Sequence, residues 1–178
     1  MCSLKLHEAV FGPDGEDAIR SAIADVAERS FFATADPCDE ARLAELASPH
    51  DRWLVATVRF DEGPCAGEVS CRLPGSLADR LFDAFSGREP EEPAPDPDQL
   101  FDLVGEFANM ICGAWLTRAA SHQSFSLSKP VVTSCPGGCT RAEAARPGLA
   151  MAIDDLPFVI DVRFGAVPAR PAATLAQA

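Results

Sequence analysis

The sequence has 178 residues, which is the size of one domain, and 47% of them are hydrophobic, enough for a sizeable core. Its 27 acidic residues against 15 Lys and Arg give a formal net charge of −12, which argues against sequence-independent binding to nucleic acid or anionic membrane, because both need clustered positive charge. It contains neither an apolar run of about 18 residues nor a signal-peptide pattern, so we expect no membrane span and a cytoplasmic location.

The first half of the chain is typical of a helix followed by a β-hairpin. Turn residues and acids begin the segment 13–32, whose apolar positions then recur at helical spacing. Residues 35–51 read as a connector with room for a helical turn. Residues 52–61 alternate as a strand, and 68–74 form the return strand after a turn. Alternate residues of the first strand point to opposite faces of the sheet: one face carries Trp53, Val55, Thr57 and Arg59, and the other carries Leu54, Ala56, Val58 and Phe60.

The second half predicts two helices and then three strands. A short amphipathic helix begins with Ser76 as its N-cap, and a connector rich in Pro and acid, residues 86–98, leads to a long helix. We expect an α+β fold with helices packed on one face of a largely antiparallel sheet. The predicted segments are the long helix 98–119, a strand in 121–133 broken at Pro130, adjacent strands 149–154 and 157–165, one domain over 1–165, and a disordered tail, 166–178.

The long helix has an unusual polar face. At about 100° per residue, Asp102, Glu106, Asn109 and Gly113 fall within roughly 60° of one another, opposite the apolar residues that should cover the sheet. Glu106 and Asn109 are three residues apart, so their side chains leave the helix as neighbours. Gly113 and the nearby Gly105 lack side chains, so the backbone of another protein could approach closely there.

This pattern has two interpretations. A carboxylate can pair with a lysine of a partner, and a carboxamide offers a donor and an acceptor, so it can hold and orient a water molecule. Positioning water beside an acyl phosphate is a suitable task, because phosphoryl transfer depends mainly on positioning and charge neutralisation. The alternative is a solvated helix face that happens to carry Glu, Asn and Gly.

The cysteines give a separate hypothesis. Seven are scattered along the chain, and only Cys135 and Cys139, in "CPGGC", have suggestive spacing. They lack a second Cys pair, so we favour a tight turn over a zinc or thiol-redox site, and we expect both thiols to be dispensable.

The chain resembles the CheC/CheX/FliY group of chemotaxis phosphatases, and most closely CheX. That group carries Asp/Ser-x-x-x-Glu-x-x-Asn on a long helix, with Asn-x-x-x-Gly and a later Pro. Asp102, Glu106, Asn109, Gly113 and Pro130 stand at these positions, although Pro130 follows Asn109 a residue or two early. The resemblance extends over roughly residues 16–165.

The resemblance implies a phosphatase that acts on the phospho-aspartate of a CheY-like response regulator. Asn109 would orient the attacking water and Glu106 would pair with a lysine of the regulator, while Asp102 would be accessory and Pro130 would shape the site. The chain would need no cofactor of its own, because Mg²⁺ would belong to the regulator. The resemblance to CheX also implies a homodimer that forms through the edges of the sheets.

Two features limit the resemblance. Some members of the group carry a second Glu-x-x-Asn on the first helix, but here Phe31 follows Glu28 at that spacing, so one site per chain is expected. The cysteine content and the Pro-rich connector are not features of the group. A chain with an intact motif could also serve as a non-catalytic module that binds a response regulator in two-component signalling.

Overall fold

The computed structural model describes residues 13–48, 51–62, 65–89, 91–120, 123–135 and 148–164. The tail predicted to be disordered, 166–178, lies outside these residues. In chain order the elements are α2 (Pro13–Phe31), β1 (Ala35–Pro37), α3 (Glu40–Leu46), β2 (Trp53–Glu62), β3 (Cys65–Pro74), α4 (Gly75–Ser86), α5 (Pro97–Ala119), β4 (Ser126–Leu127), β5 (Val131–Cys135), β6 (Leu149–Ile153) and β7 (Leu156–Phe164).

The strands form one antiparallel sheet in the order β1-β6-β7-β3-β2-β4, and β5 also pairs with β2. The predicted hairpin of β2 and β3 and the predicted neighbours β6 and β7 are confirmed. The connector predicted over 35–51 instead contributes the edge strand β1 and the helix α3. These elements are short, and α3 buries no side chain, so neither has a strong hydrophobic period in the sequence.

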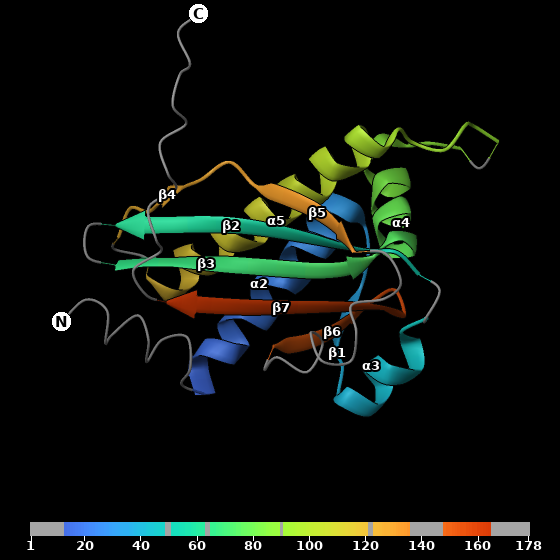
Figure 1. Ribbon diagram of the computed structural model, residues 1–178. Helices are drawn as coiled ribbons and strands as arrows, with labels where there is room; N and C mark the ends of the chain where they lie inside the picture. Colours follow the sequence, from blue (N-terminus) through green and yellow to red (C-terminus); the bar gives the residue numbers. More distant parts are fainter. Residues whose placement is uncertain are drawn as a thin grey trace, which may run out of the picture.

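Helices α2 and α5 lie side by side on one face of the sheet, and the opposite face is turned toward the viewer in Figure 1. The alternation of β2 explains this layering: Leu54, Ala56, Val58 and Phe60 are almost fully buried, whereas Arg59 on the other face is exposed. The expected α+β fold, with helices on a largely antiparallel sheet, is confirmed.

Aromatic side chains join the two layers. The ring of Phe107 on α5 stands edge-on to Phe31 of α2 at 5.1 Å and to Phe158 of β7 at 5.6 Å. The ring of Trp115, eight residues after Phe107 on α5, is edge-on to Phe60 of β2 at 5.5 Å. Such contacts add about 0.5–1.5 kcal/mol each beyond the burial of apolar area. They fix the apolar side of α5 against the sheet, and so determine which residues of α5 face outward.

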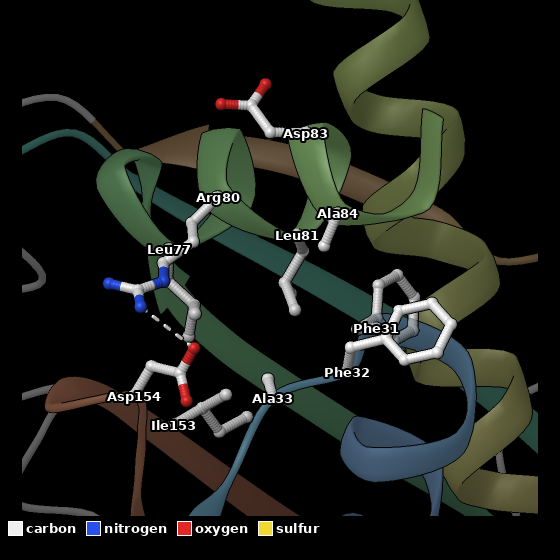
Figure 2. A pocket seen from close by; sticks show the side chains of 10 residues that line it. All are labelled: Phe31, Phe32, Ala33, Leu77, Arg80, Leu81, Asp83, Ala84, Ile153 and Asp154. Carbon is white, nitrogen blue, oxygen red and sulfur yellow. Dashed lines mark ion pairs between the residues drawn. The ribbon is translucent and has the colours of Figure 1, made fainter. Parts of the chain in front are cut away.

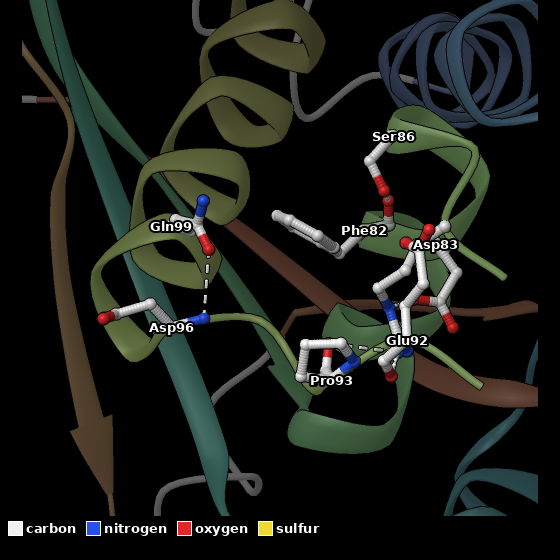
Figure 3. Close-up of polar contacts among 8 residues, drawn as sticks. Phe82, Asp83, Ser86, Glu92, Pro93, Asp96 and Gln99 are labelled. Carbon is white, nitrogen blue, oxygen red and sulfur yellow. Dashed lines mark hydrogen bonds and ion pairs between the residues drawn. The ribbon is translucent and has the colours of Figure 1, made fainter. Parts of the chain in front are cut away.

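Local polar contacts set the two ends of the acidic connector (Figure 3). Helix α4 ends at Ser86, and its C-cap Gly87 has a φ of +69°. Arg88 then pairs with Asp83 at 2.5 Å and donates to the carbonyl of Glu92 at 2.9 Å. The Asp96 carboxylate accepts from the Asp98 N–H at 2.9 Å, and the Gln99 side chain accepts from the Asp96 N–H at 3.1 Å. This capping box makes α5 begin at Pro97, one residue before the predicted start.

One predicted cap is wrong. Ser76 does not cap α4, because the N-cap is Pro74 and the helix begins at Gly75. The Ser76 hydroxyl instead donates to Asp51 at 2.7 Å, which ties α4 to the residues that precede β2. In the part of the chain that the structure describes, no helix is long and apolar enough to cross a membrane.

Candidate functional site

The exposed face of α5 is the candidate site. Asp102 and Glu106 are exposed, Asn109 and Gly113 are half-buried, and the neighbouring Phe107 is fully buried. The predicted single long helix and the exposure of Glu106 are therefore confirmed, whereas Asn109 reaches solvent only in part.

The polar side chains of this face have no ion-pair or hydrogen-bond partners among the described residues. Neither the Asp102 nor the Glu106 carboxylate forms an ion pair there, and the Asn109 carboxamide forms no hydrogen bond to those residues. Other charged residues nearby are paired: Arg118, for example, contacts Asp25 of α2. A carboxylate and a carboxamide that are adjacent and unpaired can both be used by a partner.

The two glycines of this helix do not serve the same purpose. Gly105 is buried, and a Cβ added to it would lie 3.1 Å from Pro130 Cβ and 3.4 Å from Val132 Cγ2. The expectation that another protein approaches at Gly105 is therefore wrong, because the chain's own β5 edge occupies that space. Among the residues with described positions, a Cβ at Gly113 would have only Leu127 Cδ1 within reach, at 4.0 Å, so this position leaves more room for a partner than Gly105 does.

Pro130 reaches α5 through a bulge in the edge of the sheet. Thr57 pairs with Val131 and Phe60 pairs with Leu127, so two residues of β2 face three residues of the edge. Such bulges bend a strand, and proline is tolerated there because its missing N–H breaks no ladder bond. The strand break predicted at Pro130 is confirmed, and the structure adds that Pro130 lies directly against the helix that carries Glu106 and Asn109.

Hydrogen bonds hold this bulge on β2. The Ser128 N–H donates to the Arg59 carbonyl at 2.8 Å, and the Arg59 N–H donates to the Ser128 hydroxyl oxygen at 3.0 Å. The edge is therefore a second wall beside α5, which sequence reasoning did not foresee. A bulge inserted opposite β2 could have been inferred only from the register, which the sequence of 121–133 does not reveal.

A groove of about 350 Å³ lies where the end of α2 meets α4 and the β6–β7 turn (Figure 2). Its rim carries Phe32, which is 85% exposed and has a φ of +53°, and the ion pair between Arg80 and Asp154 at 3.0 Å. On the same side of the molecule Phe85 is 59% exposed, and its ring is 5.8 Å from that of the buried Phe31. Sequence reasoning did not predict this groove, because its lining comes from α2, α4, β6 and the segments that follow α2 and β6.

The described cysteines have no metal-binding arrangement around them. No group of three or more His, Cys, Asp or Glu that could hold a metal occurs among the residues with described positions. Burial raises the pKa of the Cys71 thiol and raises that of Cys112 to about 12, so both are unreactive thiols at neutral pH. Cys135 is half-buried at the end of β5, and Cys139 lies outside the described residues, so the hypothesis about this pair stays a prediction.

Helix α2 carries no second copy of the motif. Phe31, at the position where a second asparagine would stand, is only 1% exposed and packs on Phe107. Glu28 is exposed, but it has no amide neighbour at the required spacing.

Comparison with known proteins gives the fold and the family. The structure superimposes on CheX from Vibrio vulnificus with a TM-score of 0.61 and 18% identity, covering 84% of this chain and 95% of that one. CheX from Desulfovibrio desulfuricans gives 0.60 and 18%, covering 84% and 97%. A CheX–CheY–BeF3–Mg²⁺ complex from Borrelia burgdorferi gives 0.53 and 12%, covering 83% and 96%. No curated protein matches the sequence.

The sequence itself matches the family model of the chemotaxis phosphatase CheX over residues 54–153, more than half of the chain. This range includes the whole of α5 and the bulged edge beside it. The resemblance seen in Glu106, Asn109 and their neighbours is thereby confirmed at the level of the family: the chain belongs to the CheX family of chemotaxis phosphatases.

Proposed function

We propose that this protein is a phosphatase that removes the phosphoryl group from the aspartate of a CheY-like response regulator, with Asn109 and Glu106 of α5 as its working residues. The observation that carries the proposal is the exposed Glu106 next to the half-buried Asn109, neither of which has an ion-pair or side-chain hydrogen-bond partner among the residues with described positions. The family description and the complex of a structural relative with CheY support the choice of substrate.

Asn109 would act by positioning. Its carboxamide can accept a hydrogen bond from a water molecule and donate another, and it does not titrate near neutral pH, so it is not a general base. The water oxygen attacks phosphorus in line with the bond to the aspartyl oxygen, that bond breaks, and the products are the free carboxylate and inorganic phosphate. The Mg²⁺ expected in the regulator would neutralise the developing charge, and this chain would contribute no metal.

Glu106 would hold the regulator in place. Its exposed carboxylate is one helical turn from Asn109, so an ion pair with a lysine of the regulator would fix the position of the amide. Asp102, one turn further back and also exposed, would add a weaker attraction. Gly113 would leave space for the regulator's backbone, and Pro130 would support the wall beside Asn109.

The test is the decay of candidate phosphorylated regulators from the same organism, measured together with the affinity of the complex. We expect Asn109→Ala to abolish the acceleration and largely keep the complex, because one neutral hydrogen bond contributes only about 0.5–1.5 kcal/mol. Glu106→Ala should weaken binding by about 2–5 kcal/mol if the partner lysine becomes buried and unpaired. Glu45→Ala, which removes an exposed carboxylate from α3, is the matched control and should change neither quantity.

Full activity of Asn109→Ala on a regulator that the unchanged protein dephosphorylates would rule out the water-positioning mechanism. If the protein binds a regulator but accelerates no decay, it is instead the non-catalytic binding module. The predicted homodimer is a separate proposal, which sedimentation of the full chain tests.

A further inference from the structure

The bulged edge brings one cation to the proposed site. A Cβ at Gly105 would lie 3.1 Å from Pro130 Cβ, and a Cβ at Gly113 would lie 4.0 Å from Leu127 Cδ1, so the edge is packed against α5 at Gly105 and runs along it to the neighbourhood of Gly113. These two glycines are about 12 Å apart along the helix, and Leu127 to Pro130 spans about 10 Å of extended chain. The intervening Ser128 and Lys129 therefore pass beside the helical turn between the two glycines.

Asn109 is the residue midway between Gly105 and Gly113, on the same row of the helix. Asn109 is half-buried whereas Glu106 is exposed, which agrees with an edge of the sheet that runs close to Asn109. The backbone of Lys129 consequently lies next to Asn109, whose side-chain carboxamide the proposed mechanism uses.

Lys129 is exposed, and none of the ion pairs among described residues involves its ammonium group. The sequence contains only one other lysine, Lys5. The outward face of α5, by contrast, carries carboxylates one turn apart at Asp98, Asp102 and Glu106, all exposed. An acidic face of this kind would repel a partner whose own site is anionic, unless a cation stands at its border.

We infer that Lys129 is a recognition residue for the anionic phosphoryl pocket of the partner. This inference rests on the proposed function. Glu106 would select a lysine of the regulator, while Lys129 would meet the negative charge that phosphorylation adds, so the protein would prefer the phosphorylated form. A competing account is that Lys129 only protects the open sheet edge from pairing with other strands, which is a common use of lysine.

The experiment measures the rate of regulator-phosphate decay against protein concentration, and the affinity for phosphorylated and unphosphorylated regulator, at low and high salt. We expect Lys129→Ala to raise KM about 2- to 5-fold with a smaller effect on kcat, and to reduce the preference for the phosphorylated form. Lys129→Glu should raise KM about tenfold or more, Lys129→Arg should restore it, and the loss should shrink at high salt.

Arg42→Gln is the control, because it removes a positive charge from α3, away from α5. Thermal unfolding of each variant shows that it is folded. If Lys129→Ala and Lys129→Glu match the unchanged protein in KM and in preference, the inference is overturned while the phosphatase function stands; aggregation with unchanged KM identifies edge protection instead. If the unchanged protein accelerates no decay, the proposed function fails, and the affinities alone decide: equal affinity for both forms, or no binding, overturns the inference too.

Discussion

Gly105 and Gly113 have the same identity and lie on the same helix, yet their surroundings give them different tasks. Glycine in a helix interior costs about 1 kcal/mol relative to alanine, so each needs a reason. Gly105 is buried under Pro130 and Val132, whereas Gly113 is half-buried and the nearest described atom to its Cβ position is Leu127 Cδ1 at 4.0 Å. The sequence predicted close approach at both positions, but only the fold shows that the approaching chain at Gly105 is the protein's own.

The contact between Gly105 and Pro130 makes a prediction that a double-mutant cycle tests. Gly105→Ala should leave the free energy of unfolding nearly unchanged, because about 1 kcal/mol of helix propensity is gained while the 3.1 Å contact with Pro130 Cβ pushes the edge outward. Phosphatase activity should fall, since the wall beside Asn109 moves. Pro130→Gly removes the opposing Cβ, so the double variant should regain activity relative to Gly105→Ala.

The four proteins of this cycle are compared for activity and for urea-induced unfolding. If the effect of the double variant on activity equals the sum of the two single effects to within about 0.3–0.5 kcal/mol, Gly105 and Pro130 do not act through their contact. Thr133→Ala is a further control, because it shortens an exposed side chain of the same edge that is not among the nearest neighbours of Gly105.

Among the elements, α5 presents the outward face, and its residue 113 tests whether that face docks a partner. Gly113→Ala should raise the free energy of unfolding by about 1 kcal/mol and keep activity, because the nearest atom, Leu127 Cδ1, would be at an ordinary 4.0 Å. Gly113→Leu should fold as well but weaken regulator binding strongly, because its side chain extends into the space left for the partner. Equal binding by the Ala and Leu variants would show that the partner does not approach there.

The end of α2 has an aromatic residue, Phe32, at a position where helices usually have glycine. The Ala33 N–H donates to the Ala27 carbonyl at 3.1 Å, and Phe32 between them has a φ of +53° and is 85% exposed. This is the position that glycine normally takes at a helix end. Because a bulky residue at this angle carries backbone strain, we predict that the exposed ring of Phe32 has a role in binding.

Phe32→Gly should therefore stabilise the fold by up to about 1 kcal/mol, because it removes backbone strain that L-residues feel at positive φ. If the ring contacts the regulator beside the groove of Figure 2, the same variant binds the regulator more weakly. Phe32→Ala separates the two effects, since it removes the ring and keeps the strain. Thermal unfolding and affinity are measured for both variants; unchanged affinity in both would leave the ring without a docking role.

For the whole molecule, the sequence was a good guide wherever a hydrophobic period was long. Helix α5 and the β2–β3 hairpin could be predicted because their apolar residues recur over two or more turns or along a whole strand. Elements of only a few residues, such as β1, have no such period, and their place depends on pairing with β6. The motif residues on α5 could be predicted by resemblance. The groove beside Phe32 and the bulged edge that carries Lys129 could not, because each is formed by segments that meet only in the folded chain.

Asp154 connects segments that are distant in the sequence, and its ionisation makes the stability of the fold depend on pH. It stands in the two-residue turn between β6 and β7, with a φ of +48°, and its carboxylate accepts from the Thr34 N–H at 2.8 Å and pairs with Arg80 at 3.0 Å. The Thr34 backbone hydrogen bond, followed by the Thr34 hydroxyl and Arg80, holds the pKa of Asp154 below its usual value. It therefore joins the segment after α2, helix α4 and the far end of the sheet.

Because the pKa of Asp154 is lower in the folded than in the unfolded chain, its contribution to stability is fully present above the ordinary aspartate pKa of about 3.9. That contribution is lost as pH falls through the lower, folded value. Asp154→Asn keeps a residue that tolerates positive φ but removes the charge, so it should lower the free energy of unfolding by about 1–2 kcal/mol at pH 7. The difference from the unchanged protein should shrink as pH falls below the ordinary aspartate pKa and through the lower, folded one.

The measurement is urea-induced unfolding at a series of pH values between 7 and about 2.5. Asp155→Asn is the matched control, because Asp155 occupies the same turn at positive φ but its side chain is 84% exposed and its pair with Arg42 lies at the surface. An exposed pair of this kind contributes about 0.2–1 kcal/mol at most, so its loss should be small. A deficit of Asp154→Asn that stays constant down to the lowest pH would mean that the charge on Asp154 does not hold the three elements together.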